Sequence, residues 1–123
     1  MRLLLDTHIL IWVLVRDGRL SQEQREALTD PDNALFVSAA TAYELTHLQA
    51  AGRIPLTEPL DRIQEEIGFE LVDFPAACWP AIADLPMIHR DPIDRMLVAH
   101  ALAGDFTLLT ADAHIRQYPV PTI

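Results

Sequence analysis

Short apolar runs alternate with longer stretches of mixed polarity along this chain, a pattern typical of strands that alternate with helices. Four runs predict short buried strands, namely Arg2–Leu5, Ala34–Val37, Phe69–Phe74 and Phe106–Leu109. The segment Thr7–Val15 is apolar on all sides. Its periodicity does not decide between a second strand and a buried helix, and both interpretations stay open.

The intervening segments carry the start and stop signals of helices. Ser21 and Gln24 are spaced as a capping box, which predicts a helix from Ser21 to Thr29. Ser38 is a favourable N-cap for a helix through about Ala51, stopped by Gly52. Further helices are predicted at Pro59–Ile67, at Ala76–Asp84 despite Pro80, and from Asp91, with Pro92 in its first turn, to Gly104.

This alternation predicts the α/β class, with a parallel sheet covered by helices on both faces. We find no repeat, linker or low-complexity run, and 123 residues fit a single domain spanning residues 1–123. In such sheets, ligands bind beyond the carboxyl ends of the strands. Candidate functional residues are therefore expected where the predicted strands end.

Composition and charge restrict the function. Nine basic residues against 18 acidic ones give a net charge of −9, which argues against a non-specific nucleic-acid binder. All nine basic residues are arginines, so chemistry that requires a lysine amine is excluded. The lone cysteine, Cys78, excludes an internal disulfide and is expected to be a small buried side chain.

The apolar N-terminal segment predicts neither a membrane span nor a signal peptide. Asp6 and His8 interrupt it, and neither apolar piece approaches the ~20 residues that a span requires. A protein without membrane contact, located in the cytoplasm, is the resulting expectation.

Acidic residues follow the predicted strands or lie on the helices that begin there. We expect four carboxylates to converge at one edge of the sheet: Asp6, Glu44, Asp94 and Asp112, with Asp91 as a possible fifth. Clustered carboxylates repel one another unless a cation joins them, and Mg²⁺ is a natural partner for oxygen ligands. Such a site can bind a phosphodiester and activate water, so phosphodiester hydrolysis is a plausible reaction.

Purely structural roles are the alternative for most of these acids. Asp91 and Asp94 fit a helix N-terminus, where acids favour the helix dipole, and Asp112 fits a cap for a short turn at 113–117. Glu44 is harder to explain in this way, because its helix face is largely apolar.

Histidine and tryptophan residues offer weaker signals. The short motifs His89-Arg90-Asp91 and Asp112-Ala113-His114 each lack the partners of a zinc site in the sequence. Trp12 and Trp79 are expected in the core rather than as stacking platforms for bases.

Four segments, in order, resemble the motifs of PIN-domain ribonucleases, and their spacing and the chain length resemble the VapC toxins of bacterial type II toxin–antitoxin modules. They are Leu4–His8, Ser38–Leu45, His89–Ala101 and Leu108–Asp112.

This resemblance implies a three-layer α/β/α domain and an endoribonuclease that depends on Mg²⁺ or Mn²⁺. By matched position, Asp6, Glu44, Asp94 and Asp112 would be the catalytic, metal-binding acids, with Asp91 as a possible additional acid. Thr7 and Thr110 would be supporting hydroxyls that orient carboxylates or water. Many relatives carry a lysine one turn after the second acid, whereas this chain reads Thr46–Gln49 there.

The expected partners are an RNA substrate, a cognate VapB-like antitoxin that blocks the active site, and a second copy of the chain in a homodimer. An antitoxin with a basic segment would complement the acidic pocket. The competing function is a non-catalytic PIN-like binding module whose acids only bind a basic partner segment.

Two other classes of protein also place an aspartate after the first strand. A phosphoacceptor receiver domain is disfavoured because the chain has no lysine. A haloacid-dehalogenase-like phosphatase is disfavoured because His8 stands at the position of its second aspartate.

Overall fold

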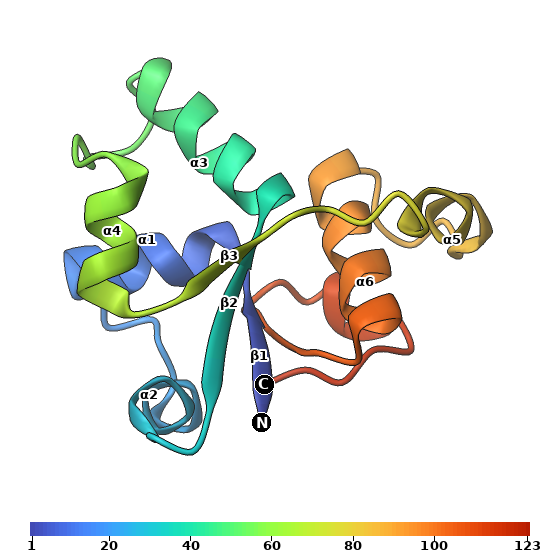
Figure 1. Ribbon diagram of the computed structural model, residues 1–123, viewed down its shortest axis with the longest axis horizontal. Coiled ribbons are helices and arrows are strands. Elements are labelled where there is room, and N and C mark those ends of the chain that lie inside the picture. Colours follow the sequence, from blue (N-terminus) through green and yellow to red (C-terminus); the bar gives the residue numbers. More distant parts are fainter.

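The computed structural model describes residues 1–123 and is built around a four-stranded parallel sheet (Figure 1). The strand order is β3-β2-β1-β4, and all three strand pairs are parallel, as predicted. The strands are β1 (Arg2–Leu5), β2 (Ala34–Ser38), β3 (Glu70–Val72) and β4 (Thr107–Leu109). Because β1 is an inner strand, the residues that follow it lie near the middle of the carboxyl edge.

Helices cover both faces of this sheet and complete a three-layer α/β/α architecture. Figure 1 shows α1, α2 and α4 on one side of the sheet and α5 and α6 on the other. None of the helices is long and apolar enough to cross a membrane. The helices are α1 (Thr7–Val15), α2 (Gln22–Thr29), α3 (Ala39–Ala50), α4 (Leu60–Ile67), α5 (Cys78–Asp84) and α6 (Pro92–Gly104), followed by the short 3₁₀ helix η1 (Ile115–Gln117).

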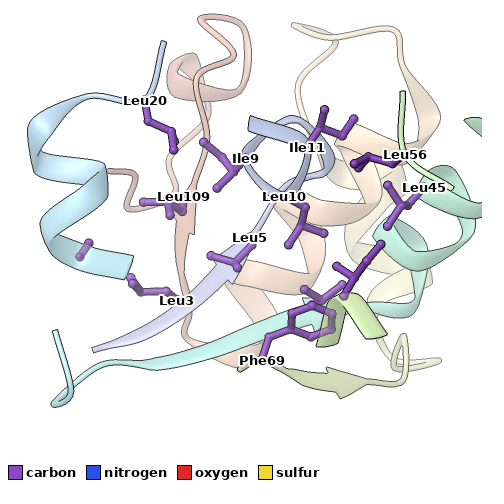
Figure 2. Packing of buried hydrophobic residues seen from close by; sticks show 13 residues of the cluster. Leu3, Leu5, Ile9, Leu10, Ile11, Leu20, Leu45, Leu56, Phe69 and Leu109 are labelled. Carbon is purple, nitrogen blue, oxygen red and sulfur yellow. The ribbon is translucent and has the colours of Figure 1, made fainter. Parts of the chain in front are cut away.

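The core is divided between the two faces of the sheet by the alternation of side chains along β1. Leu3 and Leu5 belong to a cluster with side chains of α1, α3 and α4, seen in Figure 2. Leu4, between them, belongs to a second cluster with side chains of α6 and β4. Burying each such leucine contributes about 1.5–3 kcal/mol of transfer free energy. Side chains of β1 therefore pack against the helices on both faces of the sheet.

The ambiguous segment Thr7–Val15 is the helix α1. Asp6 is its N-cap: the backbone N–H of Ile9 donates to Asp6 Oδ1 at 3.0 Å. Ile9, Leu10 and Ile11 are buried, whereas Val15 is exposed near the last turn. The segment lacks a polar face because neighbouring elements cover most of its sides, which is why its periodicity was uninformative.

Most predicted boundaries match the structure, and two elements are shorter than predicted. The Ser21–Gln24 capping box is present at the start of α2, with both reciprocal hydrogen bonds formed. The predicted strand Phe69–Phe74 is reduced to the three residues of β3, which is an edge strand. Helix α5 begins at Cys78, so Pro80 lies in its first turn, where no intrahelical N–H donor is needed.

Two helices begin at the carboxyl edge of the sheet with side-chain caps. Ser38 ends β2 and accepts the backbone N–H of Ala40 at 3.1 Å, which starts α3. Asp91 starts α6 by accepting the N–H groups of Ile93 at 2.9 Å and Asp94 at 3.3 Å. These caps direct the first turns of α3 and α6 toward the end of β1.

Candidate active site

A cleft of about 220 Å³ opens at the carboxyl edge of the sheet. All five acids singled out from the sequence line it, and no arginine does. The lining residues are Asp6, Thr7, His8, Trp12, Glu44, Asp91, Asp94, Ala111 and Asp112. Residues more than 100 positions apart thus meet in one cavity, as the predicted parallel sheet requires.

Asp6 is the most buried of these acids, with 5% of its surface exposed. Its Oδ1 caps α1, and its Oδ2 accepts a hydrogen bond from the hydroxyl of Thr110. That same hydroxyl accepts the backbone N–H of Asp112 at 3.0 Å. Burial raises the pKa of Asp6, although these hydrogen bonds partly offset the effect. Thr110 therefore links the acid that follows β1 with the acid that follows β4.

Thr7, the other hydroxyl singled out from the sequence, makes no hydrogen bond. Its Oγ1 is buried at the cleft and has no partner in the structure. A buried hydroxyl normally finds a partner, and this one has none within the chain.

Asp94 and Asp112 face each other across His89. The Nε2 atom of His89 lies 3.0 Å from Asp94 Oδ2 and 3.0 Å from Asp112 Oδ2. Burial, followed by the charge of Asp91, raises the pKa of Asp94 to about 7. For Asp112, burial acts in the same direction, but hydrogen bonds from His89 and the backbone outweigh it and lower the pKa. The two carboxylates thus differ in how readily they ionise.

Glu44 and Asp91 complete the acidic lining from two different helices. Glu44 projects from α3, is partly buried, and makes no hydrogen bond or ion pair. Asp91 uses Oδ1 to cap α6, which leaves Oδ2 without a partner.

The structural roles considered for these acids do exist beside their position in the cleft. Asp112 Oδ1 accepts the backbone N–H groups of His114 at 2.7 Å and Ile115 at 3.3 Å, so it caps the turn as considered. The other oxygen, Oδ2, contacts His89 and keeps a lone pair for a ligand, so these roles do not exclude a role of Asp112 in the cleft.

Sequence reasoning missed His89. The two histidine motifs lack zinc-site partners only when each is taken alone; in the fold, His89, Asp112 and His114 come together, with ligand atoms within 4.8 Å of one another. The sequence carries only a weak indication of this contact. Asp112 and His89 are 23 positions apart, and they meet because the end of β4 lies beside the start of α6.

The tryptophan predictions were only partly correct. Trp12 is partly buried against the core and also lines the cleft. Trp79 was predicted in the core, which is wrong: 57% of it is exposed, and its ring lies edge-on to Phe74 with centroids 5.1 Å apart. Helix α5 buries only Cys78 fully, so its opposite side remains at the surface.

A second hollow of about 460 Å³ adjoins the acidic cleft. It shares His8, Trp12, Glu44 and Asp91 with the cleft and adds the guanidinium groups of Arg19 and Arg53. Arg19 lies 4.7 Å from the ring centroid of Trp12 and pairs with Asp17 at 2.7 Å. Arginine side chains thus line the adjoining hollow but not the acidic cleft itself.

Comparison with known proteins agrees with this architecture. Ribonuclease VapC22 of Mycobacterium tuberculosis is 30% identical over 122 residues, covering 96% of this chain and 92% of that protein. The structure of VapBC2 from Rickettsia felis bound to a promoter DNA fragment matches with a TM-score of 0.73 and 18% identity, covering 100% of this chain and 98% of the matched chain. VapBC-1 from nontypeable Haemophilus influenzae gives a TM-score of 0.65 and 16% identity, covering 100% and 97%.

The family assignment rests on a match along nearly the whole sequence. The family model described as PIN domain matches residues 3–121, which include all four strands except the first residue of β1. The cleft acids therefore all fall within the matched region. This chain belongs to the PIN-domain family.

Proposed function

We propose that this protein is a metal-dependent endoribonuclease of the VapC type that hydrolyses RNA phosphodiester bonds in the acidic cleft. The observation that carries the proposal is the convergence of five carboxylates on one cavity that no arginine lines. The 30% identity to a protein named as a ribonuclease adds independent support for the reaction. Carboxylates gathered in this way are suited to a divalent cation, and a cation so held can bind a phosphodiester.

The residues of the cleft fit a hard divalent cation such as Mg²⁺ or Mn²⁺. Five of the lining residues offer carboxylate oxygens, which these ions prefer, beside the exposed imidazole of His8. The raised pKa of Asp94, at about 7, reflects burial and like charge that a cation would offset. Asp6, Glu44, Asp94 and Asp112 would hold the ion, with Asp91 as an additional acid.

A bound cation would lower the pKa of a water molecule and offset the negative charge of the phosphate. The chain's own residues prepare the cleft for this chemistry. Thr110 and the backbone of Ile9 fix both oxygens of Asp6. Glu44 approaches from α3 without competing contacts, so its carboxylate is free for a ligand. Pre-positioned carboxylates reduce the ordering that ligand binding would otherwise require.

The RNA backbone would extend from the cleft into the adjoining hollow. In a chain with net charge −9, Arg19 and Arg53 are the cations that line this continuation. Arg53, whose side chain has no partner, would supply the basic contact that the missing lysine of α3 does not, whereas Arg19 is already paired with Asp17. Because few phosphates would be neutralised, binding should depend on the cation in the cleft more than on a broad positive surface.

A VapB-like antitoxin is the proposed protein partner, and a homodimer is the proposed assembly. The matched solved structures are titled as VapBC proteins, which supports a toxin–antitoxin role for this chain. An arginine from the antitoxin could satisfy the cleft carboxylates by bidentate hydrogen bonds. The apolar side chains of Thr7–Val15 are mostly packed into the core. A cytoplasmic location is proposed with this role.

The test is RNA cleavage by the purified protein, freed of any partner, with Mg²⁺ or Mn²⁺ and after chelation. We expect cleavage that stops with chelator, returns with excess metal, and is lost in Asp6→Asn. Asparagine preserves the helix cap, so the variant should fold. Equal activity in Asp6→Asn would identify a contaminating nuclease. A folded protein that binds the basic segment of a partner and never cuts RNA would favour the non-catalytic binding module.

A further inference from the structure

We propose that His89 is a positioning residue of the acidic cleft, whose imidazole holds the carboxylates of Asp94 and Asp112 together from outside the cavity. The inference rests on the proposed function, since it concerns how the metal-binding acids are arranged. Neither the sequence motifs nor the comparisons assign this role to the histidine.

The contacts of His89 connect two acids from different elements. Nε2 lies 3.0 Å from Asp94 Oδ2, on α6, and 3.0 Å from Asp112 Oδ2, after β4. No other side chain contacts both carboxylates by a hydrogen bond or ion pair. Two carboxylates in contact with one ring atom repel each other, and the hydrogen bond from Nε2 to Asp112 offsets part of that repulsion.

Two further hydrogen bonds fix His89, one accepted by its ring and one donated by its backbone. Its Nδ1 accepts the backbone N–H of Asp91 at 3.1 Å. The backbone N–H of His89 donates to the hydroxyl of Tyr118 at 2.8 Å, and Tyr118 is almost fully buried. Because Nδ1 is an acceptor, the neutral ring carries its hydrogen on Nε2, the atom that faces the two carboxylates. The Nε2–H thus donates to Asp112 Oδ2, while Asp94 Oδ2 lies 3.0 Å from the same nitrogen as a second polar contact.

The position of His89 relative to the cavity distinguishes a supporting role from a ligand role. Asp94 and Asp112 both line the cleft, whereas His89 does not. The ring therefore contacts Oδ2 of each carboxylate from outside the cavity, and Asp94 Oδ1, which has no hydrogen-bond partner, stays open to a cation. Hydrogen-bonded partners of metal-binding carboxylates orient them in this way, and their loss typically costs 10–100-fold in metal affinity or activity.

A direct imidazole–metal site is the competing explanation for this cluster. His89, Asp112 and His114 offer three ligand atoms within 4.8 Å of one another. Coordination through His89 Nε2 would require the lone pair of the atom that carries the hydrogen, and the Asp91 contact would have to break. His114 is mostly exposed, and its Nδ1 lies 3.6 Å from Asp112 Oδ1. Substitution of His114 therefore separates the two explanations.

The experiment is Mn²⁺ titration by isothermal calorimetry of the wild type, His89→Ala, His89→Gln and His114→Ala. We expect His89→Ala to weaken Mn²⁺ binding about 10–100-fold at unchanged stoichiometry. Glutamine places an amide donor near the position of Nε2, so His89→Gln should recover most of the affinity. His114→Ala keeps the backbone donor to Asp112 and should bind as the wild type does.

RNA cleavage measured against Mn²⁺ concentration gives the second readout. The Mn²⁺ midpoint of His89→Ala should rise by the same factor as its dissociation constant, while the rate at saturating Mn²⁺ approaches the wild-type rate. A fold defect alone would instead reduce the number of binding sites without moving the midpoint.

Three results would overturn the inference. Equal affinity in the wild type and His89→Ala would remove the positioning role and leave the proposed nuclease function intact. Comparable losses in His89→Ala and His114→Ala, with no rescue by His89→Gln, would assign the cluster to direct imidazole coordination. A wild type that binds no Mn²⁺ and cuts no RNA would refute the proposed function and this inference with it.

Discussion

Asp94 and Arg95 are neighbours on α6, yet the fold treats their charges in opposite ways. Arg95 is 9% exposed and has no acidic partner, but its guanidinium donates four hydrogen bonds. The acceptors are the carbonyl oxygens of Ile82, Leu85 and Pro86 and the hydroxyl of Tyr118. Asp94 points into the cleft, where burial and the neighbouring acids disfavour its charge.

The difference shows which charge serves the fold. The carbonyl oxygens around Arg95 complement a cation and join α5 to α6, so this buried charge is satisfied by the chain itself. The raised pKa of Asp94, at about 7, means that folding opposes its ionisation. A charge that the fold opposes, and that the contact with His89 offsets only in part, indicates a ligand, since proteins keep such environments mainly at functional sites.

The largest expected effect on stability comes from removing the satisfied charge. Arg95→Met should lower the free energy of unfolding by about 3 kcal/mol, because several buried acceptors lose a charged donor. Urea denaturation measures the change. Arg90→Met, which alters an exposed arginine without a hydrogen-bonded partner, is the matched control and should change stability by less than about 0.5 kcal/mol. A loss below about 1 kcal/mol in Arg95→Met would show that the hydrogen bonds from Arg95 to these carbonyl oxygens contribute little to stability.

A smaller effect of opposite sign is expected from removing the charge of Asp94, which the fold disfavours. The pKa of Asp94 is about 7 in the fold, above its ordinary value of 3.8, so its contribution to stability is lost as pH rises between these values. Without metal, Asp94→Asn should equal the wild type near pH 4 and exceed it above pH 7 by about 2 kcal/mol, half the value of the full pKa shift because solvent screens this partly exposed carboxylate. Urea denaturation with chelator across this pH range tests the difference. A variant less stable than the wild type at pH 8 would make Asp94 a structural acid.

The cleft acids were predictable because their signals are local. Asp6 and Asp112 follow apolar strands, and parallel strands bring such positions to one edge. Glu44 stood out because a charge on an apolar helix face requires a partner or a cavity. The α/β class followed from the alternation of elements for the same reason: each strand and helix carries its own pattern of polarity.

The remaining features depend on contacts between distant segments. Nothing near His89 in the sequence indicates that its ring lies between Asp94 and Asp112, because that contact requires the packing of α6 against β4. Trp79 was misplaced since α5 has only one buried face, and the sequence does not show which face that is. The sequence of Thr7–Val15 does not distinguish a strand from a helix, because neighbours on several sides cover the segment and it needs no polar face.

The central claim is that the cleft acids serve a metal-dependent reaction and not the fold, and Glu44→Gln tests it most directly. Glu44 makes no hydrogen bond or ion pair, so glutamine keeps its shape and removes only the charge. The measurement is the RNA cleavage rate at saturating Mn²⁺, with the urea unfolding free energy taken on the same preparation. We predict a rate loss above about 100-fold, with stability unchanged or higher. Loss of a residue that only orients a metal-binding group typically costs about 10–100-fold. Wild-type cleavage by Glu44→Gln, or a rate loss accompanied by a comparable loss of stability, would contradict the claim.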